Sequence, residues 1–435
     1  MQVLEAKENG FKETPIGTIP NEWDQVRLGD IFDIQQGRAM SAERRSKNPK
    51  YPFLRTINVL WGKVDLTTLD QMYFSDEELE KLRLKKDDLL VCEGGEIGRT
   101  AIWKGEIDSC YHQNHVYRLR KKLGEIWPEF YMYWMQVAFL QLGLYAGEAI
   151  RTTIPNLSRG RLQTFIMPKP PFPEQQKIAI VLSKIQRAIE QQDKIIETTR
   201  NLKKSLMKKL FTEGIGHTEF KETEIGQIPK SWEVVKLGGK ADFQYGHTAS
   251  AISEAVGPKF LRITDIKDDG KISWEDVPYC KIEDEDYQKY KLHEGDILVA
   301  RIGATTGKTC IIKNSPDAIF GSYLIRITIN KKEILPEYVY FFTTTPIYWT
   351  QINANKEGKL KKGVSASFLK TLLIPITSTV EQQEIAHALR TIDNKIEAEQ
   401  KRKSTLQQLF KTMLHKLMTG EIRVKDLDLE VQHVH

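Results

Sequence analysis

The stretch FKETPIGTIPNEWDQVRLG, residues 11–29, occurs a second time in the chain as FKETEIGQIPKSWEVVKLG, residues 220–238. Most of its positions recur unchanged, among them Trp23, whose counterpart is Trp232. Self-similarity at a fixed offset is the sequence signature of a repeated structural unit. The stretch therefore predicts two related domains in tandem.

The similarity continues along both halves of the chain at an almost constant offset. It weakens over the first part of each copy and becomes strong again toward the end, so each copy has a variable part followed by a conserved part. The matching segments are FLRTINV (53–59) with FLRITDI (260–266), KKDDLLVCEGGEIGRTAI (85–102) with HEGDILVARIGATTGKTCI (293–311), and EQQKIAIVLSKIQRAIE (174–190) with EQQEIAHALRTIDNKIE (381–397).

The variable parts mix two kinds of pattern. Short apolar, β-like runs such as DLLVC and DILVA are interrupted by helical patterns such as PEFYMYWMQVAFL (128–140). In that segment a proline stands at the first helical turn, where its missing N–H costs nothing. Mixed strands and helices of this kind predict a compact globule of the α/β or α+β class in each copy.

The conserved parts predict two long helices, from Glu174 to Glu213 and from Glu381 to Thr419, because neither segment contains proline or glycine. Apolar residues step along each segment by threes and fours, which forms one narrow seam that must be buried against another helix. The simplest partner is the other copy, packed antiparallel, with one globule near each end of the pair. The seam residues are Ile178, Leu182, Ile185, Ile189 and Ile196, continued by Leu202, Leu206 and Leu210, and then Ile385, Leu389, Ile392 and Ile396, continued by Leu406, Leu409, Met413 and Leu417.

The composition is that of an ordinary globular protein. The 435 residues carry a formal net charge of +6, which permits a polyanionic partner without requiring one. The four cysteines, Cys92, Cys110, Cys280 and Cys310, form no C-x-x-C pair, so we expect buried thiols rather than a disulfide framework. We see no signal peptide and no membrane span, and we expect a cytoplasmic location with no membrane partner.

The stretch RIGATTGKT (301–309) resembles a phosphate-binding loop at first sight. Such a loop has four residues between its glycines, but Gly303 and Gly307 are separated by three, and the following TCIIKN is typical of a strand rather than a helix. We therefore predict a strand–turn–strand unit here. The chain also has no pattern typical of a catalytic triad or a metal site, so we expect no catalytic and no metal-binding residues.

Polar and basic side chains gather in loops that differ between the two copies. Arginine and asparagine can bind guanine and adenine edges with two hydrogen bonds, whereas lysine mostly holds phosphate. We therefore expect these loops to contact nucleic acid, although a solvated loop is the plainer interpretation of each one alone. The candidates are Arg38, Arg44, Arg45, Lys47, Lys50, Asn58, Arg99, Gln113, Asn114, Arg151 and Asn156 in the first copy, and His247, Lys308, Ser322, Tyr323, Lys356, Lys359, Lys361 and Lys362 in the second.

Taken together, these motifs resemble the specificity (S) subunit of a type I restriction–modification system, over essentially the whole chain. The resemblance is carried by IGTIPNEW and IGQIPKSW at the start of each copy, PPFPEQQKIA and VEQQEIA at the start of each helix, and KKLFTEG and HKLMTGE at their ends. One departure is ITSTVEQQ (376–383), where the family usually has a proline-rich lead. That departure affects the expected geometry at the start of the second helix.

The resemblance implies an α+β (mixed) fold with two globular α/β target-recognition domains, joined by two long antiparallel coiled-coil helices in a pseudo-twofold tandem repeat. The recognition domains are expected at 1–170 and 216–376, the spacer helices at 171–215 and 377–422, and a tail at 423–435. Each domain would read one half of a bipartite, asymmetric target in double-stranded DNA, and the helices would fix the distance between the halves.

The resemblance also implies partners that do the chemistry. Two DNA methyltransferase subunits would transfer a methyl group from S-adenosylmethionine to adenine N6, and restriction subunits with ATP-driven translocation would dock on that complex. No cofactor is expected on this chain. Two rival interpretations stay open: a protein-binding coiled-coil scaffold without DNA readout, and a nucleotide-dependent enzyme that uses residues 303–309.

Overall fold

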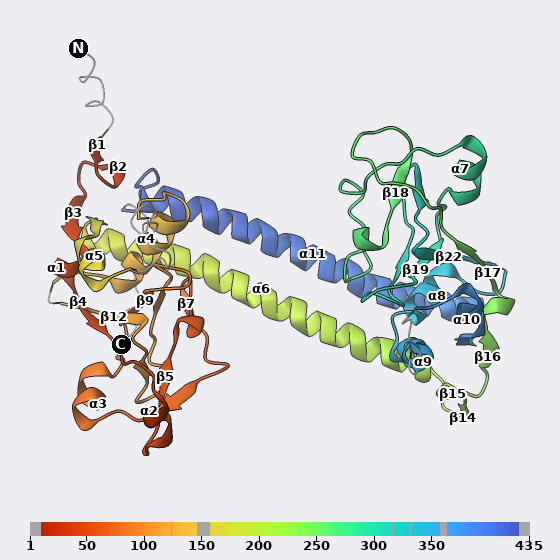
Figure 1. Cartoon of the computed structure of the whole chain (residues 1–435), viewed down its shortest axis with the longest axis horizontal. Coiled ribbons are helices and arrows are strands. Elements are labelled where there is room, and N and C mark those ends of the chain that lie inside the picture. Colours follow the sequence, from red (N-terminus) through yellow and green to blue (C-terminus); the bar gives the residue numbers. More distant parts are fainter. Residues whose placement is uncertain are drawn as a thin grey trace, which may run out of the picture. The chain divides into compact units, whose positions relative to one another are not determined.

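The computed structural model of the chain describes residues 10–122, 124–145, 157–314, 316–330, 332–356 and 363–425. Its contacts divide the chain into two compact units. The first contains residues 1–192 and 402–435, and the second contains residues 193–401 (Figure 1). Each unit therefore holds one variable part together with one end of each long helix.

The centre of the first unit is an antiparallel four-stranded sheet with the strand order β10–β9–β12–β4. Its strands are β4 (Phe32–Gln36), β9 (Leu89–Cys92), β10 (Thr100–Ile102) and β12 (Val116–Lys121). Strand β9 is buried along its whole length, as its unbroken apolar sequence predicts for a strand that is covered on both faces. The helix α4 (Pro128–Leu140) contributes many of the aromatic residues of this core.

Smaller sheets and short helices surround this centre. The strands are β1 (Phe11–Thr14) with β2 (Gly17–Pro20), β3 (Asp24–Arg27) with β13 (Ile166–Lys169), β5 (Tyr51–Leu54) between β8 (Asp70–Met72) and β11 (Tyr111–His112), and β6 (Val59–Leu60) with β7 (Lys63–Val64). The helices are α1 (Leu28–Ile31), α2 (Ala42–Ser46), η1 (Thr56–Asn58), α3 (Asp76–Leu82) and α5 (Arg159–Thr164).

The second unit repeats the central sheet of this plan and most of its smaller sheets. Its central sheet has the order β20–β19–β22–β17. These strands are, in turn, the sequence counterparts of β10, β9, β12 and β4 in the first unit. The strands are β17 (Ala241–Tyr245), β19 (Ile297–Ala300), β20 (Thr309–Ile311) and β22 (Leu324–Ile329). This agreement in topology confirms the predicted tandem repeat and the mixed α+β class.

Most of the remaining elements of the second unit also have counterparts in the first. The strands are β14 (Phe220–Thr223) with β15 (Gly226–Pro229), β16 (Glu233–Lys236) with β23 (Leu373–Ile376), and β18 (Lys259–Leu261) with β21 (Ala318–Phe320). The helices are η3 (Leu237–Gly239), η4 (Ile263–Asp265), α7 (Asp284–Tyr290), α8 (Pro336–Phe342), α9 (Pro346–Lys356) and α10 (Ala366–Thr371).

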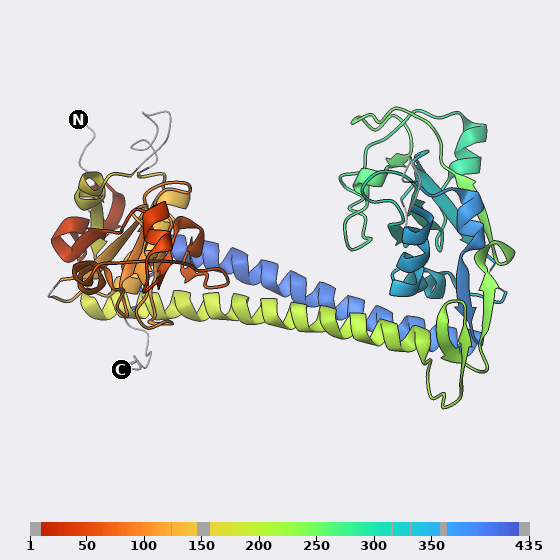
Figure 2. The same cartoon turned by 60° about the horizontal axis from the view of Figure 1, so that its bottom comes forward.

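Two helices, α6 (Phe172–Thr212) and α11 (Thr379–Met418), are far longer than the others. In the first unit the start of α6 and the end of α11 share one core, through residues such as Ile178 and Leu417. In the second unit the end of α6 and the start of α11 share another core, through residues such as Phe211 and Ile385. Within each unit the two segments therefore run side by side in opposite directions (Figure 2). The departure at ITSTVEQQ has no visible effect, because α11 begins two residues before its Glu-Gln-Gln motif, as α6 does.

The predicted seam is correct at its ends and wrong at two positions. Ile178, Leu182, Ile196, Ile385 and Leu389 are buried. The first two of these also pack into the core of the globule, so the seam does not face only the other helix. By contrast, Leu202 and Leu409 are 57% and 45% exposed, because they lie on the outer side of their helices. The expectation that the two globules lie at opposite ends of the helix pair stays a prediction.

The repeated tryptophan joins the start of each copy to its long helix. Trp23 Nε1 donates a hydrogen bond of 3.0 Å to Glu174 Oε2, and Trp232 Nε1 donates one of 3.0 Å to Glu381 Oε2. Both indole rings are fully buried. Glu174 and Glu381 are the first residues of the two Glu-Gln-Gln motifs. In each copy, therefore, the motif that opens the copy and the motif that opens the long helix are in direct contact, although they are far apart in the sequence.

The next residue of each motif holds a second helix in place. The buried amide of Gln175 accepts a hydrogen bond from the backbone N–H of Trp127, the N-cap of α4, and donates to the carbonyl of Pro170. In the second copy Gln382 accepts from the backbone N–H of Leu335, the N-cap of α8, and donates to the carbonyl of Thr377. These bonds satisfy buried polar groups that would otherwise destabilise the fold.

The two copies differ in the side chain that faces this carboxylate. In the first unit Arg423 donates from Nε and Nη2 to Glu174, at 2.6 and 2.8 Å, and from Nη2 to Glu22 at 2.8 Å. In the second unit the Nε2 atom of His217 lies 2.9 Å from Glu381 Oε1. Arg423 follows the end of α11 and binds Glu174 near the start of α6. His217 follows the end of α6 and contacts Glu381 near the start of α11.

The expectations for cysteines and for the membrane can be compared with the structure. Cys92, Cys110, Cys280 and Cys310 are free and buried, as predicted. None of the helices within the described part of the chain is long and apolar enough to cross a membrane.

Candidate nucleic-acid interface

Two of the polar clusters predicted from the sequence meet at one end of the central sheet in the first unit. Arg38, just after β4, pairs with Gln113 in a parallel bridge, and its backbone N–H donates to the carbonyl of His112. The two segments can cross closely because Gly37 has no side chain: a Cβ there would lie 2.1 Å from the His112 carbonyl oxygen. The loops 37–50 and 112–115 thus form one continuous surface, although they are far apart in the sequence.

A carboxylate that the sequence analysis did not single out lies beneath this surface. Glu93 directly follows β9, and its side chain is only 9% exposed. Its Oε1 accepts a hydrogen bond of 3.1 Å from the hydroxyl of Tyr117, and its Oε2 lies 3.2 Å from Nδ1 of His115. The imidazole of His115 is 53% exposed, so it connects the buried carboxylate to the surface.

Burial determines the protonation of the groups around this cluster. Burial and the adjacent Glu93 carboxylate raise the pKa of the Tyr117 hydroxyl, so Tyr117 remains a hydrogen-bond donor at neutral pH. Burial lowers the pKa of His112 to about 4, and its Nδ1 lies 2.8 Å from the carbonyl of Val116. His112 is therefore a neutral core residue, and His115 is the histidine of this cluster that faces outward.

The basic residues of the 37–50 loop fall into two groups. Glu78 holds two of them, because Arg38 Nε lies 2.8 Å from Oε1 and Arg44 Nη1 lies 2.7 Å from Oε2. Burial raises the pKa of Glu78, but the Arg44 hydrogen bond and the nearby charges outweigh it and the pKa is lowered overall. The guanidinium of Arg44 is largely buried, so it fixes the loop, whereas Arg38 stays half exposed.

The remaining basic residues of this loop are exposed. Arg45 is 3.9 Å from Asp70, and Lys47 is paired with Glu43 one helical turn away. Lys50 is also exposed. Such exposed cations suit contacts to a phosphate backbone better than contacts to base edges. Their role in DNA binding stays a prediction.

Two other candidates of the first unit are used inside the fold. Asn58 is buried: its Oδ1 accepts from the backbone N–H of Arg55, and its Nδ2 donates to the carbonyls of Asp65 and Thr68. Both donors of the side chain are used inside the fold, so Asn58 has a structural role, and its predicted contact with DNA stays a prediction. Arg99 donates to the carbonyl of Thr56 and to Glu96, which leaves its guanidinium mostly buried.

The stretch 301–309 is a strand–turn–strand unit, as predicted. Strands β19 and β20 pair antiparallel, with Val299 opposite Thr309, and no helix follows the turn. The ammonium of Lys308 lies 2.8 Å from Asp268 Oδ1 and is mostly buried. This geometry contradicts the alternative of a nucleotide-binding loop, because the lysine is bound to a carboxylate and no helix N-terminus is present to hold a phosphate.

The equivalent surface of the second unit carries different side chains. His247 pairs with Gly321 in a parallel bridge, as Arg38 does with Gln113 in the first unit. The guanidinium of Arg301, just after β19, lies 4.7 Å from the ring centroid of Tyr245. Its Nη1 donates a long hydrogen bond of 3.4 Å to the carbonyl of Ser322. The adjacent Tyr323 is 56% exposed.

Several candidates cannot be compared with the structure. Arg151, Asn156, Lys359, Lys361 and Lys362 lie outside the described residues, and Lys356 is the last residue of α9, with a side chain that the structure does not describe. Conversely, the sequence analysis missed Gln36, Glu93, Tyr245 and Arg301. The aligned pair VCEGG and VARIG carried a signal for two of them, because a glutamate and an arginine replace one another beside a conserved strand.

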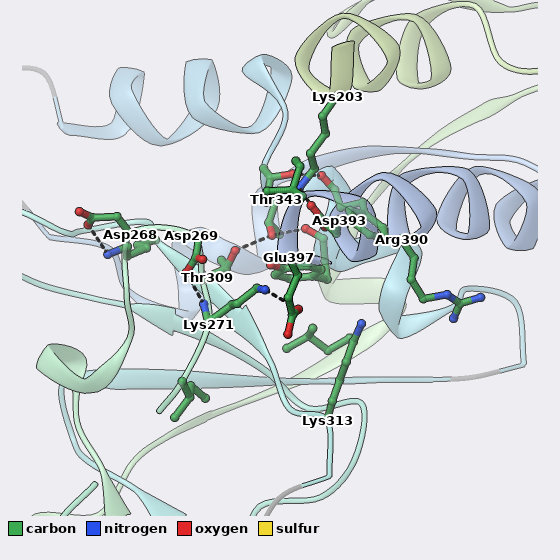
Figure 3. Close-up of a pocket in the computed structure, with 18 of the residues that line it drawn as sticks. Lys203, Asp268, Asp269, Lys271, Thr309, Lys313, Thr343, Arg390, Asp393 and Glu397 are labelled. Atoms are coloured by element: carbon green, nitrogen blue, oxygen red, sulfur yellow. Dashed lines mark hydrogen bonds and ion pairs between the residues drawn. The ribbon is translucent and has the colours of Figure 1, made fainter. Parts of the chain in front are cut away.

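A cavity of about 830 Å³ lies in the second unit, where the loop 268–274 approaches both long helices. Figure 3 shows Lys203 beside Asp393 and Lys271 beside Glu397; each of these two ion pairs has an N–O distance of 2.6 Å. Within the described part of the chain there is no cluster of three or more histidine, cysteine or acidic residues that could hold a metal ion. Of the two ion pairs that line the cavity, Lys271–Glu397 joins the loop to α11, and Lys203–Asp393 joins α6 to α11.

Comparison with known proteins identifies the relatives of this chain. The family model described as "Type I restriction modification DNA specificity domain" matches twice, over residues 20–199 and 229–408. The putative MjaX and the MjaVIII specificity subunits of type I restriction enzymes from Methanocaldococcus jannaschii are each 30% identical. These alignments cover 96% and 97% of this chain, and 98% of each relative.

A solved structure has the same fold. The S subunit of a type I restriction–modification system from M. genitalium superposes with a TM-score of 0.58 at 17% sequence identity. The superposition covers 93% of this chain and 98% of the other. At this level of identity the likeness concerns the fold alone.

Proposed function

Because the chain belongs to the family of type I restriction–modification DNA specificity proteins, we propose that its two domains each read one half of a bipartite, asymmetric DNA target. Sequence-specific DNA recognition is the function that this family membership gives the chain, and catalysis is not part of it. The asymmetry of the target is supported by the two equivalent surfaces. They share a backbone geometry but present Arg38, Asn114 and His115 in one unit, and His247, Ser322 and Tyr323 in the other.

The observation that carries this proposal is the matched position of those surfaces. In both units the surface lies where the first strand of the central sheet ends, and a glycine allows the close crossing there. A Cβ at Gly246 would lie 2.2 Å from the Gly321 carbonyl oxygen, and a Cβ at Gly37 would lie 2.1 Å from the His112 carbonyl oxygen. A conserved frame with exchanged polar side chains is what two readers of different base sequences require.

The partners follow from the same role. Two DNA methyltransferase subunits would bind the chain, hold S-adenosylmethionine and methylate adenine N6 after the base has been turned out of the duplex. Restriction subunits with ATP-driven translocation would join this complex. The work of this chain is to bind DNA and to place those subunits on it. We also propose a cytoplasmic location, where such a complex would have access to duplex DNA.

The direct test is to exchange one reader. The chain is expressed with its methyltransferase partner in a host without other DNA methylation, and the methylated motif is read by sequencing the methylome. Replacing residues 15–168 by the same region of a relative should change one half of the motif and leave the other half unchanged. A change in both halves, or a wild-type strain without any methylated motif, would contradict the proposal.

The long helices give a second test. Since α6 and α11 are continuous over 41 and 40 residues, they should fix the number of unread base pairs between the halves, at about 3.4 Å for each. Deleting one heptad from each helix should shorten the preferred spacing and leave both half-sites as they were. If the spacing stays the same, the helices are not the ruler.

A further inference from the structure

The two proposed DNA-reading surfaces contain a pair of positions that match residue for residue but carry opposite charges. Cys92 pairs with Val116 in the first unit, and Ala300 pairs with Leu324 in the second, so Glu93 and Arg301 are the residues that leave the same strand at the same register.

The backbone hydrogen bonds of these two residues are also the same. The N–H of Glu93 donates to His115 at 2.9 Å, and the N–H of Arg301 donates to Tyr323 at 3.0 Å. The carbonyl of each accepts a hydrogen bond of 2.9 Å, from Leu157 in the first unit and from Val364 in the second. A difference in function must therefore come from the side chains.

The side chains around the two positions have been exchanged as a set. In the first unit Glu93 faces Gln36, His115 and Tyr117, so an acceptor is surrounded by groups that can donate to it. Gln36 Nε2 lies 3.5 Å from Oε2 of the carboxylate and donates at 3.0 Å to the carbonyl of Asn114. The result is a carboxylate held in one orientation, with the exposed His115 beside it.

In the second unit the same positions build a cationic site. Tyr245 occupies the register position of Gln36, and its ring supports the guanidinium of Arg301. The hydroxyl of Tyr245 accepts a hydrogen bond of 3.0 Å from the backbone N–H of Ala366, which keeps the ring in place. The Nε atom of Arg301 is buried with no hydrogen-bond partner in the structure. A buried donor without a partner is costly, and a ligand that accepts its hydrogen would remove that cost.

We propose that Glu93 and Arg301 set the type of base that each domain selects at one position of its half-site. This inference rests on the proposed function. A carboxylate accepts but cannot donate, so the Glu93 site selects a base with an exocyclic amino group in the major groove, which is adenine or cytosine. The guanidinium donates and cannot accept, so the Arg301 site selects guanine, whose N7 and O6 both accept.

The experiment uses the full chain assembled with its methyltransferase partner, and it selects duplexes from a pool of random sequence. Arg301→Gln should lower the preference for guanine at one position by about tenfold or more, because a two-bond contact is lost. Glu93→Gln should lower the rejection of guanine and thymine by a similar factor at one position of the other half. The amide of the new glutamine can donate to the acceptors of those bases.

Two control variants keep the result interpretable. Arg390→Gln removes a guanidinium of the second unit that binds Glu337 and lies on α11, and it should leave both halves unchanged. Tyr117→Phe removes a hydrogen bond to Glu93 but keeps the carboxylate, and it should keep the wild-type base preference even if it lowers thermal stability.

The outcomes separate this inference from the proposed function. Changes confined to one position in one half for Arg301→Gln, and to one position in the other half for Glu93→Gln, would support it. An unchanged motif, changes in both halves from a single variant, or an equal loss of binding to every duplex would overturn it while the proposed function stands. A wild-type complex that enriches no sequence would overturn the proposed function and this inference with it.

Discussion

The two units share a frame to the level of single hydrogen bonds, but a different side chain binds the central carboxylate in each. Trp23 and Trp232 donate to Glu174 and Glu381 at the same distance of 3.0 Å. Around the carboxylate, however, the first unit uses a guanidinium and the second an imidazole. The frame has been kept because it holds the reader on its helix. The side chain that binds the carboxylate differs, because any hydrogen-bond donor that follows the end of the other helix can satisfy it.

The largest expected effect tests whether the frame is the same in both units. Trp23→Ala and Trp232→Ala each remove a fully buried indole, and each should lower the free energy of unfolding of its own unit by about 3–5 kcal/mol. Hydrogen exchange during urea unfolding reports each unit separately. Trp61→Ala is a suitable control, because Trp61 is only partly buried and donates to Glu96. Unequal losses for Trp23→Ala and Trp232→Ala would break the equivalence of the two frames.

The next effect compares the two side chains that bind the carboxylates, Arg423 in the first unit and His217 in the second. Glu174→Ala leaves the guanidinium of Arg423 without its main partner, and a guanidinium cannot give up its charge. Glu381→Ala instead leaves an imidazole, His217, without this partner. The first substitution should therefore destabilise its unit by about 2–3 kcal/mol and the second by about 1 kcal/mol less.

The same hydrogen-exchange measurement compares these variants, and Arg423→Ala in the Glu174→Ala background supplies the control. If the loss is caused by a stranded charge, the second substitution should restore part of the stability. Equal losses of stability in Glu174→Ala and Glu381→Ala would mean that it does not matter whether a guanidinium or an imidazole binds the carboxylate.

A smaller effect concerns the dependence of the second unit on pH. Burial raises the pKa of Glu381, but hydrogen bonds from Thr377, Ile215 and His217 outweigh it, so the pKa lies below its usual value. A carboxyl whose pKa is lowered by folding stabilises the folded unit above the unfolded pKa, about 4.3. That stability is lost as the pH falls through the lower, folded pKa. Unfolding experiments between pH 3 and 7 should show this loss in the wild type and a flatter profile in Glu381→Gln.

An exposed carboxyl of the same unit provides the comparison for this titration. Glu219 is paired with Lys230 at the surface, and both side chains are largely exposed. Glu219→Gln should keep the acid sensitivity of the wild type. If it flattens the profile as much as Glu381→Gln does, the sensitivity comes from general charge effects and not from the buried carboxylate.

The sequence was sufficient for the frame and insufficient for the reading site, for a physical reason. Repeats, long helices and the strand–turn–strand unit at 301–309 depend on local patterns that recur along the chain, and these predictions are confirmed. The structural role of Asn58 depends on three backbone groups that its amide reaches, and no local pattern in the sequence shows that these groups lie near it. Leu202 and Leu409 were misjudged because a long helix drifts relative to its seam, and periodicity alone does not show which side is covered.

The site itself is assembled from residues that no local pattern connects. Gln36, Glu93 and His115 come from three separate strands or turns, and only the register of the sheet brings them together. Comparing the two copies position by position would have found Glu93 and Arg301, because a change of charge next to a conserved strand is unusual. Within a tandem repeat, therefore, the positions that differ beside a conserved frame are the best sequence guide to specificity.

The smallest expected effect concerns how each globule is braced on its helix. In the first unit Gln186 of α6 accepts a hydrogen bond of 3.2 Å from the buried Tyr133, and its amide lies 3.5 Å from the carbonyl of Gly62. In the second unit the corresponding brace is the exposed pair of Lys271 and Glu397, at the edge of the cavity in Figure 3. Salt weakens an exposed ion pair by screening its charges, whereas it has little effect on a neutral hydrogen bond away from water.

Gln186→Ala should therefore cost the first unit about 1 kcal/mol at any ionic strength. Lys271→Ala should cost the second unit about 0.2–1 kcal/mol at low salt and less at 1 M salt, since both partners are solvated. Unfolding at the two salt concentrations distinguishes the braces. A salt-independent loss for Lys271→Ala would mean that the lysine acts through the packing of its stem over the cavity. The brace of the second unit would then be of the same kind as that of the first, in spite of its charges.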